Sequence, residues 1–346
     1  MKNWQRLNSD QAYRRRMEQR SEIVFGIRNF FRGRGFFEAE TPVMVASPDM
    51  EPHLSPFATE LQRNDGQSLA AHLITSPEYS LKKLLAGGYD KVFELARCFR
   101  NGEPWNGQHN PEFTMLEWYR TGADYTDIMR DTEELTAELC EQVNGSTRIE
   151  YDGQQFDLAA PWRRLSVGEA FDRHVGLDLA AGIDDPERFI ALARDKGYNL
   201  SDDENFDDTF YKIFLSDIEP QLGQREPVIL YDFPRSMAAL ARLKATDHRF
   251  AERFEVYVRG IELCNAFSEL TDSTEQEKRF LAEQAERQKL GLPTFPLDKQ
   301  LLTALQDIDQ AAGIALGVDR LVMLLTDVPS IEDVLFFPAK DIFSNK

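Results

Sequence analysis

The chain has 346 residues, of which 42% are hydrophobic and 29% charged, as in a soluble globular protein with a sizeable core. Its formal net charge of −19, from 40 basic and 59 acidic residues, argues against a large non-specific grip on nucleic-acid phosphates. The N-terminus is polar, the apolar stretches are too short to span a bilayer, and the three cysteines lack metal-ligand spacing. We therefore expect a cytoplasmic protein without structural zinc.

The first third of the chain predicts one long helix followed by strands. Apolar residues at helical spacing predict a helix over residues 10–32, which glycines end, and a strand over 36–41 before Pro42. A short strand is expected at 73–75, followed by a helix that starts at Ser76-Pro77 and ends at Gly87-Gly88. Two further strands, 92–100 and 113–119, enclose a reversal rich in glycine, proline and asparagine.

The remainder predicts strands in runs, not in alternation with helices. We expect helices over 124–144, 166–174, 186–196, 209–222, 275–289, 298–309 and 319–325, a hairpin over 149–158, an acidic loop over 202–208, and strands over 227–233, 253–264 and 313–318. This order favours an antiparallel α+β fold over a doubly wound sheet. Neither a Walker-type loop nor a dinucleotide-binding fingerprint is present. We expect one domain over residues 1–346, with a variable insertion at about 121–235.

The hairpin over residues 97–119 carries the most informative group of side chains. It holds Arg100, which suits a phosphate, His109 near a second phosphate, and Phe113, whose ring suits a base. The other interpretation is an ordinary charged hairpin. The accompanying segments have to decide between the two.

Three accompanying segments can be interpreted in the same way. Ser76 and Glu78 at a strand-to-helix turn suit a ligand ammonium group, although they also suit an ordinary capping turn. At 313–320, Gly317 allows close backbone approach, Asp319 can cap a helix and Arg320 can reach a phosphate. The alternative there is a tight strand-to-helix packing turn.

The third segment, 260–272, sets Glu262, Asn265 and Glu269 among apolar residues. Buried carboxylates need a compensating cation, and Mg²⁺ bridging polyphosphate oxygens would provide one. A regular strand would divide these three residues between its faces, so this interpretation requires a bulge or strand end near 264–266. The alternative is a partly exposed edge strand.

Together these segments strongly resemble the three signature motifs of class II aminoacyl-tRNA synthetases: the first helix to Pro42, residues 93–119, and residues 313–325. Within that class, the runs 109–117 and 260–265 resemble the lysyl-tRNA synthetase branch. A complete anticodon-binding barrel does not fit ahead of the first motif, so we expect no anticodon-binding domain. The chain therefore resembles most the bacterial elongation factor P–lysine ligases, truncated paralogues of the lysyl-tRNA synthetases.

The resemblance implies activation of (R)-β-lysine, or lysine, by ATP as an aminoacyl-adenylate, and transfer to the ε-amino group of one lysine of elongation factor P. It also implies Mg²⁺ and a homodimer, and neither tRNA nor a membrane is an expected partner. The alternatives are a truncated synthetase that charges tRNA, a non-catalytic synthetase-like regulator, and an amide ligase that uses ammonia. The lysine-type pair of Ser76 and Glu78 disfavours the last.

The resemblance also implies roles for individual residues. Amino-acid binding would fall to Ser76, Glu78, Tyr119, Asn265, Glu269 and Ala315. ATP binding would fall to Arg100, Asn101, Glu103, His109, Asn110, Phe113, Glu262, Leu263, Gly317 and Arg320, with Glu262 and Glu269 holding Mg²⁺.

Two positions depart from or distinguish the family pattern. Ala315 stands where tRNA-charging relatives usually have glycine, which would reshape the pocket floor for a β-amino acid. The motif 2 arginine is usually followed by Asn-Glu, but here Gly102 separates Asn101 from Glu103. We expect Glu103 to take the adenine amino group.

Overall fold

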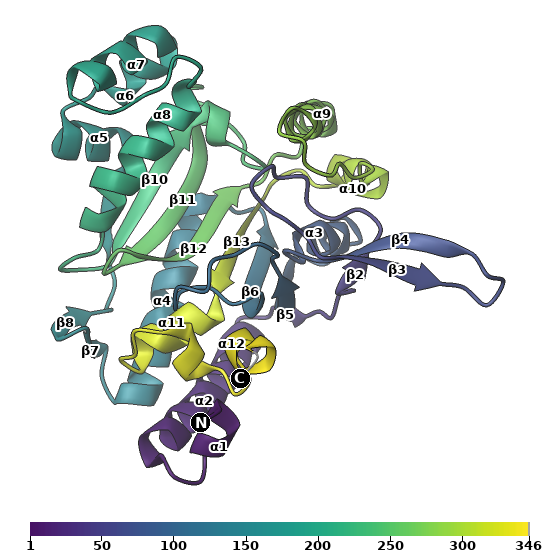
Figure 1. Cartoon of the computed structure of the whole chain (residues 1–346), viewed down its shortest axis with the longest axis vertical. Coiled ribbons are helices and arrows are strands. Elements are labelled where there is room, and N and C mark those ends of the chain that lie inside the picture. Colours follow the sequence, from purple (N-terminus) through teal and green to yellow (C-terminus); the bar gives the residue numbers. More distant parts are fainter. Residues whose placement is uncertain (345–346) are drawn as a thin grey trace.

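The computed structural model describes residues 1–344, built around one large sheet (Figure 1). The sheet has eight strands in the order β1-β5-β6-β13-β12-β11-β10-β9. Their bounds are β1 Phe37–Glu38, β5 Lys91–Phe99, β6 Glu112–Thr121, β9 Arg163–Ser166, β10 Val228–Pro234, β11 Phe250–Val258, β12 Ile261–Ser268 and β13 Ala311–Gly317. Neighbours are antiparallel except at the edges, where β1 pairs with β5 and β9 with β10 in parallel. The predicted α+β fold is confirmed.

Two small sheets and the helices complete the described chain. The smaller sheets contain β2 Met44–Val45, β3 Ala58–Gln62 and β4 Ser68–Leu73, and β7 Arg148–Tyr151 with β8 Gln154–Asp157. The α-helices are α1 Asn3–Arg6, α2 Gln11–Gly33, α3 Glu78–Ala86, α4 Tyr125–Asn144, α5 Val167–Val175, α6 Leu179–Asp184, α7 Pro186–Asp195, α8 Phe206–Ile213, α9 Ser273–Lys289, α10 Lys299–Ala304, α11 Val318–Leu325 and α12 Ala339–Phe343. None of these helices is both long and apolar enough to cross a membrane.

One face of the large sheet is covered by a continuous apolar core. Leu116 and Trp118 of β6 and Ile314 of β13 pack there, all at most 2% exposed. The same core contains residues of α2, α4 and α11. Because side chains alternate along a strand, the neighbours of these residues must face the other side.

The other face carries three smaller cores and a cavity, and the smallest core contains Ile74, Ala96, Cys98 and Met115. One core joins α3, α9 and α10 to the β5–β6 side of the sheet. The second joins α5–α8 to β9–β11, and Figure 1 shows these helices gathered at one end of the molecule. The residues predicted as an insertion, 121–235, therefore include this helical group, but also α4 of the main core and two strands of the sheet.

The prediction of one strand over 253–264 is wrong. The chain reverses at Arg259 and Gly260, which have φ values of 54° and 72°, and β11 and β12 form a hairpin. Two consecutive left-handed residues are the mark of a type I′ turn, for which Gly260 was the sequence signal. The hairpin β3–β4, which projects from the body in Figure 1, was also missed. Every residue of β3 is exposed, so it has no apolar alternation to detect.

A bulge in β12 settles which side chains share a face. Val256 pairs with Cys264 but Tyr257 pairs with Glu262, so Leu263 is an extra residue in the ladder. The bulge lies one residue before the predicted interval of 264–266. It brings Glu262 onto the same face as Asn265, the arrangement that the functional interpretation of this segment requires.

Candidate active site

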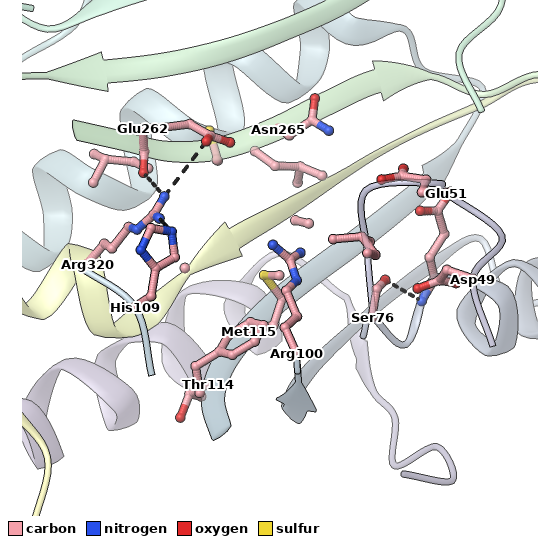
Figure 2. Close-up of a pocket in the computed structure, with 18 of the residues that line it drawn as sticks. Asp49, Glu51, Ser76, Arg100, His109, Thr114, Met115, Glu262, Asn265 and Arg320 are labelled. Carbon is pink, nitrogen blue, oxygen red and sulfur yellow. Dashed lines mark hydrogen bonds and ion pairs between the residues drawn. The ribbon is translucent and has the colours of Figure 1, made fainter. Parts of the chain in front are cut away.

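A cavity of about 280 Å³ opens on this face of the sheet, next to the core that contains Tyr79 and Phe280. Every predicted site residue lines it except Asn101 and Glu269. Figure 2 shows Arg100 near the middle, Arg320, His109 and Glu262 towards one end, and Ser76 with Asp49 and Glu51 towards the other. We call these the arginine end and the amine end.

The arginine end is built from the β5–β6 hairpin and the start of α11. Arg100 follows β5, and its buried Nε atom has no hydrogen-bond partner in the described chain. Its guanidinium lies 5.2 Å from the centroid of the Phe113 ring. Arg320 donates from Nη1 to the carbonyl oxygen of Glu262 at 2.8 Å and lies 3.8 Å from its carboxylate. Two guanidiniums far apart in sequence therefore open onto one cavity.

His109 lies between an arginine and a carboxylate. Its Nε2 is 3.1 Å from Arg320 Nη2 and 3.7 Å from Glu103 Oε2, and its Nδ1 is 3.1 Å from Asn106 Oδ1. Burial, reinforced by the Arg320 charge, lowers the pKa of His109. A neutral imidazole leaves the positive charge at this end to Arg320 and Arg100.

Asn110, Asn101 and Asp319, which neighbour these residues, make hydrogen bonds or ion pairs within the protein. Asn110 donates to the carbonyl of Glu112 at 2.6 Å and accepts from the amide of Ala339 at 2.9 Å, so it fastens the motif 2 loop to α12. Asn101 is exposed, outside the cavity, and its amide donates to the carbonyl of Ser55. Asp319 does not cap α11 as expected, because its carboxylate accepts from the Thr114 amide and pairs with Arg20 at 2.6 Å.

The prediction that Glu262 and Glu269 hold one magnesium ion together does not fit the strand. Along seven residues of β-structure, even with one bulge, their positions are roughly 20 Å apart. Glu269 is also engaged by Lys82 Nζ at 2.5 Å. Residues 1–344 contain no group of three or more His, Cys, Asp or Glu side chains that could hold a metal ion.

A better partner for Glu262 is Glu255 of β11. The register pairs Glu255 with Asn265 and Tyr257 with Glu262, so these four residues occupy one face of the hairpin. Burial, opposed by the Arg253 charge and reinforced by the Glu262 charge, raises the pKa of Glu255 to about 7. Two carboxylates combined with substrate phosphate oxygens are a normal donor set for Mg²⁺. Glu255 was not predicted as a site residue.

The amine end rests on a buried carboxylate, Glu117. It accepts from the Ser76 hydroxyl at 2.6 Å and the Tyr119 hydroxyl at 2.8 Å. Glu117 is 0% exposed, and burial, together with the Glu78 charge, raises its pKa well above the usual range. Ser76 also accepts from the amide of Glu78, so the capping interpretation and the site interpretation of this turn are both correct in geometry.

Glu78 and Glu269 meet through a shared cation. Lys82 Nζ lies 2.5 Å from both carboxylates, and its side chain is 2% exposed. Burial acts to lower the pKa of Lys82, but the two carboxylates outweigh it and raise that pKa. Burial, opposed by the Lys82 charge, raises the pKa of Glu78 and raises that of Glu269 to about 8, so one lysine does not keep both groups fully ionised at neutral pH.

Comparison with known proteins gives this geometry a family. Residues 2–341 match the family model of class II tRNA synthetases (D, K and N). The chain belongs to the class II aminoacyl-tRNA synthetase family.

Relatives within this synthetase family carry two different names. The chain is 39% identical over 322 residues to the elongation factor P–(R)-β-lysine ligase of Proteus mirabilis, covering 92% of this chain and 94% of the relative. It is 40% identical to the ligase of the same name from Salmonella paratyphi B, covering 92% and 93%. It is 41% identical over 324 residues to the lysine–tRNA ligase of Pelotomaculum thermopropionicum, covering 93% of this chain but 62% of that relative.

Two glycines of this synthetase pocket have different reasons to be glycine. A Cβ at Gly313 would lie 2.1 Å from the Tyr119 ring and 2.7 Å from Glu269 Oε1, so internal packing requires glycine there. A Cβ at Gly317 would find its nearest atom at 3.8 Å, an ordinary contact. Packing within the described chain therefore does not require a glycine at position 317.

Sequence reasoning missed three further carboxylates at the amine end. Asp49, Glu51 and Glu283 line the cavity. Burial raises the pKa of Asp49 to about 7 and that of Glu283 to about 8, the latter reinforced by Glu51. The loop 46–57 and the polar helix 273–289 gave no apolar pattern that would have marked these positions as inward-facing.

Proposed function

We propose that the chain is an ATP-dependent ligase that activates (R)-β-lysine, or lysine, and transfers it to a lysine ε-amino group of elongation factor P. The proposal depends chiefly on one cavity that has two guanidiniums at one end and several carboxylates at the other. Such a cavity suits a molecule that is anionic at one end and carries amino groups at the other. The relatives named as elongation factor P ligases, which this chain matches along nearly their whole length, give the reaction.

In the first step, a carboxylate oxygen of the amino acid attacks the α-phosphorus of ATP. The bond from that phosphorus to the bridging oxygen breaks, and pyrophosphate leaves with its electron pair. Arg100 and Arg320 offset the negative charge that builds up on the phosphoryl oxygens. Holding both reactants in one cavity can contribute about 7–11 kcal/mol to lowering the barrier, so no nucleophilic side chain is required.

The amine end selects the substrate. A diamino acid carries two ammonium groups, and Glu78, Tyr119 and Asn265 line the part of the cavity that would receive them. Ala315 forms part of the floor, where its methyl group limits depth. Glu117 and Glu269, behind the lining, hold Ser76, Tyr119 and Lys82 in place through the contacts described above.

In the second step, the neutral ε-amine of the acceptor lysine attacks the carbonyl carbon of the adenylate. The carbon–oxygen bond to AMP breaks, an amide forms, and the amine loses a proton. A carboxylate with a raised pKa near the carbonyl, or the departing phosphate, can accept that proton.

Magnesium fits this site through Glu262 with Glu255, and it would supply charge neutralisation on the polyphosphate. Adenine is assigned to the Phe113 ring, with Glu103 and His109 at the edge of the same space. Asn101 is not retained in the proposal, because it lies outside the cavity. The described residues form one catalytic domain in this proposal, and two copies associate through the first motif. Light scattering can test the dimer.

The test is ATP–pyrophosphate exchange with (R)-β-lysine, L-lysine and a monoamino control such as norleucine. Exchange with the diamino acids and not with norleucine is expected. Elongation factor P and tRNA(Lys) are then offered as acceptors, and mass spectrometry should find the protein heavier by one lysyl unit. Absence of exchange with every amino acid would refute the proposal in favour of a non-catalytic protein.

A second candidate is charging of tRNA, favoured by the 41% identity to a lysine–tRNA ligase. Aminoacylated tRNA without modified elongation factor P would establish it. The residue at position 315 offers a sharper comparison, because an Ala315→Gly variant deepens the floor. We expect this variant to shift exchange from the β-amino acid towards L-lysine.

A further inference from the structure

Residues 46–57 join β2 to β3 and pass over the amine end of the cavity; we call them the strap. Three of its side chains, Asp49, Glu51 and Leu54, line the cavity. Figure 2 shows Asp49 and Glu51 on the Ser76 side, with Arg320 at the opposite side. The shape of the strap therefore sets how the amine end is closed.

The two ends of the strap are fastened by ordinary contacts. On one side Asp49 accepts from the Thr75 hydroxyl, and Met50 is 2% exposed in the core of α3 and α9. On the other side the Ser55 carbonyl accepts from the Asn101 amide at 2.8 Å. Between these anchors the backbone turns, with the Leu54 amide donating to the Glu51 carbonyl at 3.2 Å.

A single buried guanidinium fills the inside of this turn. Arg287 of α9 is 1% exposed, and its Nη1 donates to the carbonyls of Glu51 at 2.7 Å and Leu54 at 2.9 Å. Its Nε donates to the carbonyl of Pro293 at 2.7 Å. The guanidinium carbon lies 4.8 Å from the centroid of the Phe295 ring.

Arg287 differs from the other arginine of the same helix in having no carboxylate partner among the described residues. Arg279, two turns earlier in α9, pairs with Glu275 besides donating to two backbone carbonyls. For Arg287, burial is the one influence that shifts its pKa, downward, and no carboxylate offsets it. Burying an unpaired charge is unfavourable, and hydrogen bonds to neutral carbonyls offset only part of the lost hydration. The contribution of Arg287 to the structure is therefore a defined backbone shape at residues 51–54.

We propose that Arg287 is a positioning residue for amino-acid selection: it fixes the strap so that Glu51 and Leu54 close the amine end around a diamino acid. The identity of the substrate class rests on the proposed function. The fixing of the strap does not, because it follows from contacts within the chain alone.

The kinetic test compares Arg287→Gln and Arg287→Lys with Lys289→Gln. The control removes a charge from the same helix at a side chain that is 74% exposed and paired with Glu286 instead of the strap. For Arg287→Gln we expect KM for the diamino acid in pyrophosphate exchange to rise at least about tenfold, the effect of losing charge-assisted hydrogen bonds. KM for ATP and kcat should stay within about twofold, because Arg287 contacts the strap at Glu51 and Leu54 and not at Ser55, where the strap meets Asn101 of the β5–β6 hairpin. Equal changes in both KM values, or none, would overturn the proposal.

Arg287→Lys keeps the charge but lacks the planar fork, so its KM should fall between wild type and Arg287→Gln. If Arg287→Gln does not fold, judged by its thermal unfolding, this conservative variant decides the question alone. A lysine variant identical to wild type would then count against the proposal.

A second measurement is independent of catalysis. Hydrogen–deuterium exchange of a peptide covering residues 51–57 should be faster in both Arg287 variants than in wild type and Lys289→Gln, while peptides of β5 and β6 are unchanged. Unaltered exchange in the strap would refute its fixing by Arg287. If wild type exchanges pyrophosphate with no amino acid, the proposed function fails, and this experiment still decides the role of Arg287.

Discussion

The two faces of the large sheet are made by alternate residues of the same strands, yet they are built in opposite ways. In β6, Leu116 and Trp118 enter a closed apolar core, while Glu117 and Tyr119 between and beside them serve the cavity. One face gains stability by excluding water. The other retains space and buried carboxylates with raised pKa values, which is unfavourable until a cationic ligand arrives. Strand alternation therefore separates stability from binding in this protein.

The largest expected effect comes from removing a cation at the arginine end. Arg100→Met should lower the rate of pyrophosphate exchange about a hundredfold to a thousandfold, because a positioned donor to the transition state is lost. The free energy of unfolding should hardly change. Arg97→Met is the matched control, since Arg97 lies on β5, three residues before Arg100, with a side chain that is 54% exposed. A variant of Arg100 with nearly full activity would break the assignment.

The next effect belongs to the closed face. Leu116→Ala removes a fully buried side chain and should lower the free energy of unfolding by about 2–5 kcal/mol in denaturant titrations. Well below its unfolding midpoint, the variant should keep KM values close to wild type. A large change in KM with little change in stability would show that the two faces are not separable in this way.

Gly313 and Gly317, both on the cavity face, should respond differently to an added methyl group. Gly313→Ala should destabilise the fold by about 1–3 kcal/mol, because its methyl group would strike the Tyr119 ring. Gly317→Ala should leave the unfolding free energy nearly unchanged and raise KM for ATP severalfold. Chemical unfolding and exchange kinetics on both variants provide the check. Reversed outcomes would mean that ATP does not approach Gly317.

The smallest effect is one of pH. The pKa values of Asp49, about 7, and Glu283, about 8, mean that both groups lose charge as the pH falls from 8 to 6. Fewer carboxylates then face the substrate ammonium groups, so KM for the diamino acid should rise severalfold over that interval. The stability of the unliganded protein should follow the opposite trend, and increase as the pH falls. These raised pKa values mean that the folded state binds more protons than the unfolded one, so unfolding free energy declines as pH rises from about 4 to 8. Exchange kinetics at pH 6 and 8, with norleucine as control, measure the trend in KM. Calorimetric unfolding at the same two pH values measures the trend in stability.

The sequence predicted the framework well where periodicity or a motif was strong. The helix α2, the hairpin β5–β6 and the segment β13–α11 have close to the expected bounds, since their apolar patterns or glycine punctuation are unambiguous. The cavity brings Arg100 and Arg320 together as expected from the family resemblance.

What could not be predicted depends on pairing between distant segments. Glu255 became a candidate ligand only once the β11–β12 register was known, because nothing in its own strand, which also carries Glu252 and Arg253, sets it apart. Lys82 and Glu117 are buried ionisable groups within elements whose sequences indicate only a helix and a strand. Arg287 lies on a mostly polar helix, and two of its three carbonyl partners are 236 and 233 positions away in the sequence.

A single extra residue, Leu263, is enough to place Glu262 and Asn265 on the same face of β12. On its amine side, β12 follows the phase set by Phe267 and Asn265, and without the bulge that phase would turn Glu262 into the hydrocarbon interior. One surplus amino acid thus resets the alternation midway along the strand. If Leu263 were instead absorbed into regular pairing, β12 would keep its hydrophobic pattern, but Glu262 and Asn265, three residues apart, would face opposite sides of the sheet.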